Sequence, residues 1–144
     1  PVKEELYFAM EGLGSYKISR DAVISDLDDL IERSNKLPID YKRENYVIVG
    51  SRSHMSAETE EFFDEKKKEH GNVEVMAVGS SLKLCMVAEG KADAYPRYAP
   101  TMEWDTGAGD AICRMAGFQV LQYNTDIPVV YNKENLLNPW FLVK

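Results

Sequence analysis

The stretch Tyr46-Val47-Ile48-Val49-Gly50 (YVIVG) decides the fold, because it is a short, continuous apolar run typical of a strand buried on both faces. A second strand is predicted over residues 73–78 (VEVMAV), and the segment between Ser56 and Gly71 is predicted to be a helix. Strand, helix and strand with short links form a βαβ unit, in which the strands are parallel and the crossover is right-handed. The sequence therefore predicts an α/β fold.

Caps and charges mark this helix and the one that follows it. Ser56 is a suitable N-cap, acidic residues occupy the first turns, lysines 66–68 stand near the end and Gly71 follows. After the second strand, Gly79-Ser80-Ser81 is expected to cap another helix over residues 80–89.

The loops that follow the two strands, residues 50–54 and 79–81, should leave the sheet at the same edge because the strands are parallel. Open α/β sheets bind ligands at this carboxyl edge. In a chain with a net charge of −7, the groups gathered there predict a site for a small anion. These groups are Arg52, His54, Ser80, Ser81 and Lys83.

The other segments complete a mixed sheet of about five strands flanked by helices. They comprise a hairpin, a polar linker with one short helix, several short strands and a tail that is expected to pack at an edge. In chain order these are residues 5–10 with 15–18, the helix near 26–34 within 19–44, the strand 92–97 ending at Pro96, the strands 118–123 and 128–131, and the tail 136–143.

Residues 104–117 are predicted to form a helix that begins WDTGAGDAI. Its apolar face is expected to contain Ala108, Ile112 and Met115, and to be widened by Ala111 and Cys113. Two glycines near the start are unexpected, because each costs about 1 kcal/mol relative to Ala in a helix interior.

The two glycines suggest a role for the start of this helix. Gly107 and Gly109 leave the helix N-terminus bare, where free N–H groups attract phosphate. Asp105 beside them fits two roles. It is either a capping carboxylate or a ligand of Mg²⁺, which binds one or two carboxylates together with phosphate oxygens. The pattern alone leaves both roles open.

Other candidate residues also have more than one interpretation. Ser80 and Lys83 fit the S-x-x-K pattern of an activated nucleophile, but the companion S-D-N and K-T-G motifs are absent. They also fit an anion site, or an N-cap followed by a solvated lysine. His54 fits a general base, a ligand contact or an exposed residue, and Arg97 fits a phosphate ligand or a surface arginine. Nearby aromatic residues are expected in the core, namely Tyr95, Tyr98 and Trp104.

Composition narrows the class of protein. A length of 144 residues predicts one domain, residues 1–144, and the negative net charge argues against nucleic acid or an anionic membrane as partner. No apolar run approaches the roughly 18 residues of a membrane span, and no signal peptide is visible. Cys85 and Cys113 lie in apolar helical patterns, which indicates buried, reduced thiols in a cytoplasmic protein rather than a zinc site.

Several segments, taken together, resemble one family. In their order along the chain they are similar to the C-terminal half of bacterial 3'(2'),5'-bisphosphate nucleotidases of the CysQ type, within the inositol monophosphatase superfamily. The segments are GSSLK (79–83), VAEGKAD (87–93), YPR (95–97) and WDTGAG (104–109), together with SRSH (51–54) and LNP (137–139).

The resemblance implies the C-terminal lobe of the inositol monophosphatase-like fold. It also implies Mg²⁺-dependent, Li⁺-sensitive hydrolysis of the 3'-phosphate of 3'-phosphoadenosine 5'-phosphate, giving AMP and phosphate. Asp105 is implied as a Mg²⁺ ligand. Contacts to this bisphosphorylated nucleotide are implied for His54, Ser80, Lys83 and Arg97. Gly107 stands where Ala is usual, and Asp110 replaces a small or polar residue, which leaves the role of Asp110 open.

Part of the family pattern is absent. The Glu-Glu and Asp-Pro-(Ile/Leu)-Asp-Gly-Thr elements, which supply most of the metal site from the N-terminal half, are not found, and Pro38-Ile39-Asp40 has the wrong flanks and position. Because two-metal phosphoryl hydrolysis needs several carboxylates, we expect the chain alone to be inactive or nearly so. Its expected partner is the missing N-terminal, metal-binding lobe. Homo-oligomerisation and peripheral association with the inner membrane are left open.

Two other functions stay open. One is a phosphatase domain for inositol monophosphate or fructose 1,6-bisphosphate. Ser80, Lys83 and Arg97 argue against it, because a simple inositol phosphate has no second phosphate to hold. The other is a free-standing module that binds a nucleotide or anion without chemistry.

Overall fold

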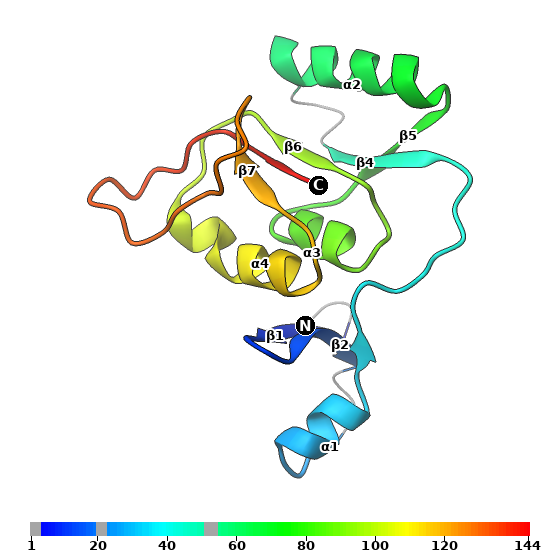
Figure 1. Cartoon of the computed structure of the whole chain (residues 1–144), viewed down its shortest axis with the longest axis vertical. Helices are drawn as coiled ribbons and strands as arrows, with labels where there is room; N and C mark the ends of the chain where they lie inside the picture. Colours follow the sequence, from blue (N-terminus) through cyan, green and yellow to red (C-terminus); the bar gives the residue numbers. More distant parts are fainter. Residues whose placement is uncertain (1–3, 20–22, 51–54) are drawn as a thin grey trace.

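A mixed sheet forms the centre of the computed structural model, which describes residues 4–19, 23–50 and 55–144 (Figure 1). A parallel bridge between Ile48 and Ala94 joins a parallel pair of strands to an antiparallel set of three, in the order β5-β4-β6-β8-β7. The strands are β4 (Tyr46–Gly50), β5 (Val73–Ala77), β6 (Tyr95–Arg97), β7 (Val120–Gln122) and β8 (Phe141–Val143). The predicted mixed α/β architecture is confirmed.

Helices cover both faces of this sheet. On one face lies α2 (Ala57–His70), whose Phe62 and Phe63 pack with Ile48. On the other face lie α3 (Leu82–Ala88) and α4 (Glu103–Met115), which share a core with Val47 and Val49. Since successive side chains of a strand point to opposite faces, the run YVIVG contributes to both cores.

The predicted caps of α2 are confirmed. The Ser56 hydroxyl accepts a hydrogen bond from the Thr59 backbone N–H at 3.3 Å. At the other end, the helix stops at Gly71, whose φ of 75° lies in the left-handed region that glycine enters without steric cost.

The N-terminal segment forms a small antiparallel sheet of its own against α4. It contains β1 (Glu5–Met10), β2 (Gly14–Ser19) and β3 (Asn35–Lys36) in that order, and α1 (Leu27–Glu32) lies between β2 and β3 in the chain. Tyr7 and Ala9 pack against the core cluster that α3 and α4 share. Figure 1 shows this sheet on the side of α3 and α4 that faces away from the central sheet. The predicted hairpin and short helix are confirmed.

The tail does not pack at an edge, which corrects the expectation for residues 136–143. β8 lies between β6 and β7, and its Phe141 and Val143 are almost fully buried. Residues 128–131 form no strand and make only an isolated bridge, between Pro128 and Leu121. Pro128 lacks the N–H that a ladder needs. Pro96, by contrast, lies in the middle of β6 instead of ending it.

The outward face of α4 also differs from the prediction. Ala108 and Ala111 are exposed, whereas Thr106, Gly109 and Asp110 are buried with Ile112 and Cys113. Gly109 on the buried face packs against Leu84 of α3, Thr106 forms hydrogen bonds with Asn138 and Tyr131, and Asp110 pairs with Arg114. The apolar residues of α4 therefore lie on two faces: Ile112 and Cys113 on the buried face, and Ala108 and Ala111 on the exposed face.

The two cysteines lie in the core between α3 and α4. Cys85 and Cys113 are both buried and free, and the Cys113 thiol donates to the Leu84 carbonyl at 3.3 Å. The prediction of buried, unpaired thiols is confirmed. Within the described part of the chain, no helix combines the length and apolarity needed to cross a bilayer.

A buried carboxylate ties the N-terminal sheet to the end of α3. Glu89 accepts hydrogen bonds from the hydroxyls of Tyr7 (2.6 Å) and Tyr41 (2.7 Å) and from the ammonium groups of Lys17 (2.9 Å) and Lys91 (2.8 Å). Burial alone would raise the pKa of this carboxyl, but the four donors outweigh it and lower the pKa to about 2. The charged form is therefore the one that the fold stabilises.

We expect Glu89→Gln to lower the free energy of unfolding by about 3 kcal/mol at neutral pH, because it removes the buried carboxylate that pairs with Lys91 and leaves Lys17 with Glu5 as its remaining partner. The folded pKa lies below the usual 4.5, so this stabilisation is present above pH 4.5 and is lost as the pH falls toward 2. Urea unfolding at several pH values measures the difference. The exposed Glu134→Gln serves as control, and an equal effect of both variants at neutral pH would contradict the prediction.

Candidate functional site

A cavity of about 550 Å³ lies between the first turns of α3 and α4 and the strand β6. It brings together four of the five residues to which the family resemblance gave a role, although they come from three separate segments. These four are Ser80, Lys83, Arg97 and Asp105. The fifth, His54, lies outside the described residues.

Lys83 and Arg97 bring two positive charges to the same wall of the cavity. Burial lowers the pKa of the Lys83 ammonium, and the positive charge of Arg97 lowers it further. The Lys83 ammonium is 3.5 Å from the Ser80 carbonyl, and Arg97 donates from Nη2 to the Pro100 carbonyl at 3.2 Å. Within the described residues neither cation forms an ion pair with a carboxylate.

Arg97 has unused hydrogen-bonding capacity. Its Nε is buried and has no hydrogen-bond partner in the described structure, a state that costs about 1–3 kcal/mol or more for a charged group. Two neighbouring cations, one of them with a buried and unpaired donor, are arranged as in a binding site for an anion.

The serines before α3 do not cap it as predicted. Ser81 occupies the N-cap position, but its hydroxyl makes no hydrogen bond to the first turn. Ser80 has a φ of 52°, in the left-handed region that is uncommon for a residue with a side chain. Both residues line the cavity, so their hydroxyls are not needed to hold the helix.

Asp105 performs the capping role that the sequence left open. Its Oδ2 accepts a hydrogen bond from the backbone N–H of Met102, the residue before the helix, at 2.9 Å. The carboxylate is exposed and borders the cavity. Among the described residues, no group of three or more His, Cys, Asp or Glu side chains could hold a metal ion. Asp105 alone therefore does not form the implied Mg²⁺ site.

Asp110 does not belong to this cavity. It is buried, and its Oδ2 accepts from Arg114 Nε at 2.8 Å while its Oδ1 has no partner. Burial raises the pKa of Asp110, and the neighbouring Arg114 opposes that shift. The second carboxylate of the WDTGAGD stretch therefore faces a different environment from Asp105.

Trp104 corrects another prediction. The sequence placed it in the core, but it is 69% exposed and lies at the rim of the cavity, whereas Tyr95 and Tyr98 are buried as predicted. Helical spacing places Trp104 on the same face as Ala108 and Ala111, and the sequence did not indicate that this face is the exposed one.

Sequence analysis missed a polar network that holds the loop before β8 against α4. The buried Asn138 donates from Nδ2 to Thr106 Oγ1 at 2.9 Å and to Thr101 Oγ1 at 3.2 Å. Tyr131 donates its hydroxyl proton to Thr106 at 3.2 Å. The one sequence signal for Asn138 was its place in the LNP segment (137–139) of the family resemblance, which did not indicate these hydrogen bonds.

The two glycines of α4 have different surroundings. A Cβ on Gly109 would lie 3.0 Å from Leu84 Cβ on α3, closer than packed carbon atoms normally approach. A Cβ on Gly107 would meet Tyr131 Cε1 at 3.7 Å, an ordinary contact. Gly109 is therefore favoured by close helix packing, which differs from the expected role of baring the helix N-terminus.

We expect Gly109→Ala to lower stability by about 1 kcal/mol, because overpacking against Leu84 outweighs the gain in helix propensity. Gly107→Ala should leave stability unchanged or raise it by up to about 1 kcal/mol, since the helix gains propensity without a clash. Thermal unfolding of the two variants tests the pair. Equal shifts in the same direction would contradict this account.

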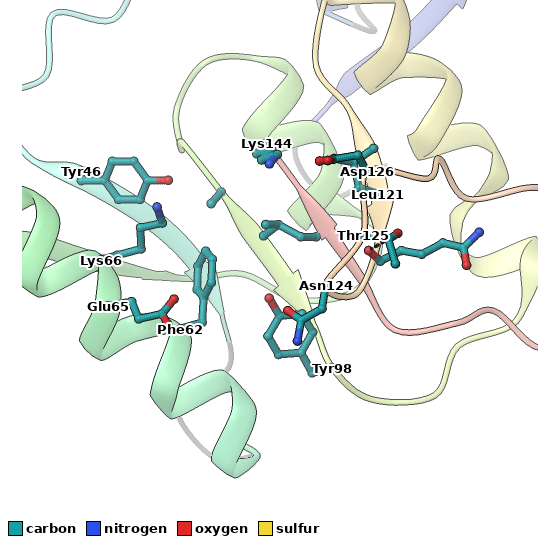
Figure 2. A pocket seen from close by; sticks show the side chains of 13 residues that line it. Tyr46, Phe62, Glu65, Lys66, Tyr98, Leu121, Asn124, Thr125, Asp126 and Lys144 are labelled. Carbon is teal, nitrogen blue, oxygen red and sulfur yellow. Dashed lines mark hydrogen bonds between the residues drawn. The ribbon is translucent and has the colours of Figure 1, made fainter.

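A second cavity, of about 360 Å³, lies against the face of the sheet that α2 covers (Figure 2). Figure 2 shows the Lys66 side chain between the aromatic rings of Tyr46 and Phe62, with Tyr98 across the opening. Lys66 is already paired with Glu69 at 2.5 Å. The second cavity therefore offers an anion less unpaired positive charge than the first.

The fold and the first cavity define an α/β protein in which Lys83 and Arg97 share a cavity at the edge of the sheet. A family model described as "Inositol monophosphatase family" matches residues 1–140. The chain therefore belongs to the inositol monophosphatase family.

Individual relatives within this family are of the CysQ type. The chain is 43% identical over 98 residues to the 3'(2'),5'-bisphosphate nucleotidase CysQ of Escherichia coli (strain K12), covering 67% of this chain and 38% of that protein. It is 32% identical over 144 residues to CysQ of Aggregatibacter actinomycetemcomitans, covering 99% and 49%. The crystal structure of CysQ from Bacteroides thetaiotaomicron matches with a TM-score of 0.92 and 53% identity, covering 100% of this chain and 55% of that one.

These comparisons confirm the resemblance drawn from the sequence. They also show that the chain spans only 38% to 55% of the length of these relatives. The comparisons therefore show the family of the chain and do not by themselves assign it the activity of the whole relatives.

Proposed function

We propose that this chain is the nucleotide-binding half of a Mg²⁺-dependent phosphatase that removes the 3'-phosphate from 3'-phosphoadenosine 5'-phosphate, giving AMP and phosphate. The observation that carries the proposal is the pair of cations Lys83 and Arg97, which lack a carboxylate partner among the described residues and share a cavity with Asp105. In this proposal residues 1–144 act as one domain.

The charges of the cavity suit a ligand with two phosphates. One phosphate accepts hydrogen bonds from Lys83 and Arg97, which relieves the repulsion between them and supplies the buried Arg97 Nε with a partner. The other phosphate lies on the Asp105 side, where two negative groups require a cation between them. By family resemblance, Ser80 and His54 also contact the nucleotide.

The implied Mg²⁺ needs ligands beyond those that the structure describes. Asp105 offers one carboxylate, and one of its oxygens already accepts the Met102 N–H. Two-metal hydrolysis needs several carboxylates. We therefore assign Asp105 as one ligand of a metal site that another half of the family fold completes, and assign phosphate binding and orientation to the residues of this chain.

The cation pair also distinguishes between substrates. A monophosphate placed next to Asp105 would leave Lys83 and Arg97 without an anion, with two half-buried positive groups close together and the buried Arg97 Nε unpaired. This supports a bisphosphorylated nucleotide over a simple inositol phosphate, and the CysQ relatives support the same choice.

A specific observation also favours a second function, a module that binds a nucleotide without chemistry. The cavity contains one carboxylate, and the described residues hold no cluster of metal-ligating groups. Both functions use the same anion site. They differ in whether carboxylates from outside this chain join Asp105 to form a metal site.

We expect Lys83→Ala and Arg97→Ala each to weaken binding of adenosine 3',5'-bisphosphate roughly 10-fold to 100-fold, the effect of removing a hydrogen bond to a charged group. Titration calorimetry without divalent metal measures this. The exposed Lys67→Ala on α2 removes the same charge away from the cavity and should have no effect. Equal affinities for all variants would refute the anion site.

Residues 1–144 alone should release little or no phosphate from 3'-phosphoadenosine 5'-phosphate in the presence of Mg²⁺, because one carboxylate cannot hold the metal and activate water. A phosphate-release assay run beside a full-length CysQ relative tests this. Turnover by the chain close to that of the relative would refute the proposal that this chain binds the phosphates and that most metal ligands come from another half of the family fold.

A further inference from the structure

A groove lined by acidic and aromatic side chains lies between α2 and the turn that follows β7. It consists of the second cavity described above, of about 360 Å³, and a smaller one of about 120 Å³ that shares Phe62, Glu65, Tyr98 and Asn124 with it. The two cavities together are called the acidic groove below. Their size falls in the range of roughly 300–1,000 Å³ that is usual for sites that bind small molecules.

Four carboxylates line the acidic groove. Glu58, Glu61 and Glu65 lie on one face of α2, because they follow one another at spacings of three and four residues. Asp126 lies on the opposite wall, in the turn after β7, and Figure 2 shows it across the opening from Glu65. Within the described part of the chain, none of the four carboxylates forms an ion pair.

The lysines of the acidic groove do not balance these carboxylates. Lys66 and Lys144 both line it, but Lys66 is already paired with Glu69. The groove therefore has an excess of negative charge. A ligand that carries several positive charges would remove this excess and would be attracted to the groove from solution.

Tyr98 supplies a buried polar group that has no partner in the protein. The residue is 6% exposed and lines both cavities, and Figure 2 shows its ring pointing into the opening. Its hydroxyl forms no hydrogen bond with any described residue. Burial raises the pKa of Tyr98, and the nearby Tyr123 and Glu65 raise it further, so the hydroxyl keeps its proton. Its oxygen is free to accept a hydrogen bond from a bound N–H donor.

The aromatic rings of the acidic groove already hold one ammonium group. Lys66 Nζ lies 5.8 Å from the ring centroids of both Tyr46 and Phe62. Ammonium groups are attracted to the faces of aromatic rings at such distances. The ring of Tyr98 packs edge-on against Phe62 at 6.2 Å and continues this aromatic lining into the groove. A further ammonium group would thus find both rings and carboxylates.

The spacing of the carboxylates distinguishes between kinds of cation. Acidic residues three or four positions apart on a helix have Cβ atoms about 5–6 Å apart, so Glu58, Glu61 and Glu65 form a row. Among the described residues, no group of three or more side chains could hold a metal ion. The repeat along the row is comparable to the distance between neighbouring ammonium groups of a linear polyamine. The methylene segments of such a molecule would lie against Phe62.

We infer that the acidic groove is a binding site for a linear polyamine, whose ammonium groups pair with the four carboxylates and donate to the Tyr98 hydroxyl. This inference goes beyond the proposed function. The acidic groove uses neither Lys83 nor Arg97, lies on the face of the sheet that α2 covers, and needs no nucleotide.

Titration calorimetry of residues 1–144 with spermidine, a linear polyamine, tests the site. The unsubstituted chain should bind spermidine saturably at physiological ionic strength. The double variant Glu61→Gln, Glu65→Gln should weaken binding roughly tenfold or more, because it removes two charge-assisted hydrogen bonds. The double variant Glu60→Gln, Asp64→Asn removes the same charge from α2 away from the groove and should have little effect. Absence of saturable binding, or equal losses in both variants, would overturn the inference.

Two competitors identify the kind of ligand. Mg²⁺ added at equal charge should not displace spermidine, because the carboxylates form a row and not a metal cluster. Full displacement by Mg²⁺ would indicate general attraction of counter-ions and would overturn the inference. A short oligolysine peptide should bind no more tightly than spermidine. Tighter binding of the peptide would assign the acidic groove to a basic polypeptide instead and would also overturn it.

NMR locates the ligand without relying on the charge variants. Spermidine should shift the ring resonances of Phe62 and Tyr98 and leave those of Phe8 and Tyr16, which stack on each other in the N-terminal sheet, unchanged. Tyr98→Phe keeps the ring and removes only the hydroxyl, so it should weaken binding severalfold. Shifts that spare Phe62 and Tyr98, or full affinity of the Tyr98→Phe variant, would contradict the assignment.

Discussion

The contact between Gly109 of α4 and Leu84 of α3 sets the geometry on which the candidate site depends. A Cβ at Gly109 would lie 3.0 Å from Leu84 Cβ, so a larger residue there would force Leu84 or the two helices to shift by a few tenths of an ångström. Lys83 directly precedes Leu84, and Asp105 lies one helical turn before Gly109. The same contact therefore determines how far the positive wall of the cavity stands from its carboxylate.

The fold concentrates charge on both sides of this contact. Lys83 and Arg97 repel each other strongly enough to help lower the pKa of the lysine, and the described residues do not neutralise either of them. Glu89, at the other end of α3, has its charge fully matched by four donors. At the C-terminal end of α3, the Glu89 carboxylate and its donors form a complete charge network that stabilises the fold. At the N-terminal end, Lys83 lies near Arg97 without a carboxylate partner among the described residues, an arrangement that favours an anionic ligand.

Sequence periodicity predicted most elements but misjudged how some are packed. α2, β4 and β5 follow from local caps and apolar runs, and the structure contains them nearly as predicted. The tail was expected at an edge because its residues give no sign of what lies on either side, yet β8 pairs with β6 and β7. Trp104 and Ala108 were assigned to the core because apolar character does not tell which face of a helix points inward.

By itself, the sequence determined the βαβ unit, the hairpin and the residue types of the site, because strand and helix periodicity, caps and the family segments are local properties. Only the tertiary structure decided that Ser80, Lys83, Arg97 and Asp105 share one cavity, since this depends on the packing of α3, α4 and β6. It also decided that Asp110 is buried with Arg114, away from Asp105, because the rotation of α4 separates two carboxylates that lie five residues apart in the sequence.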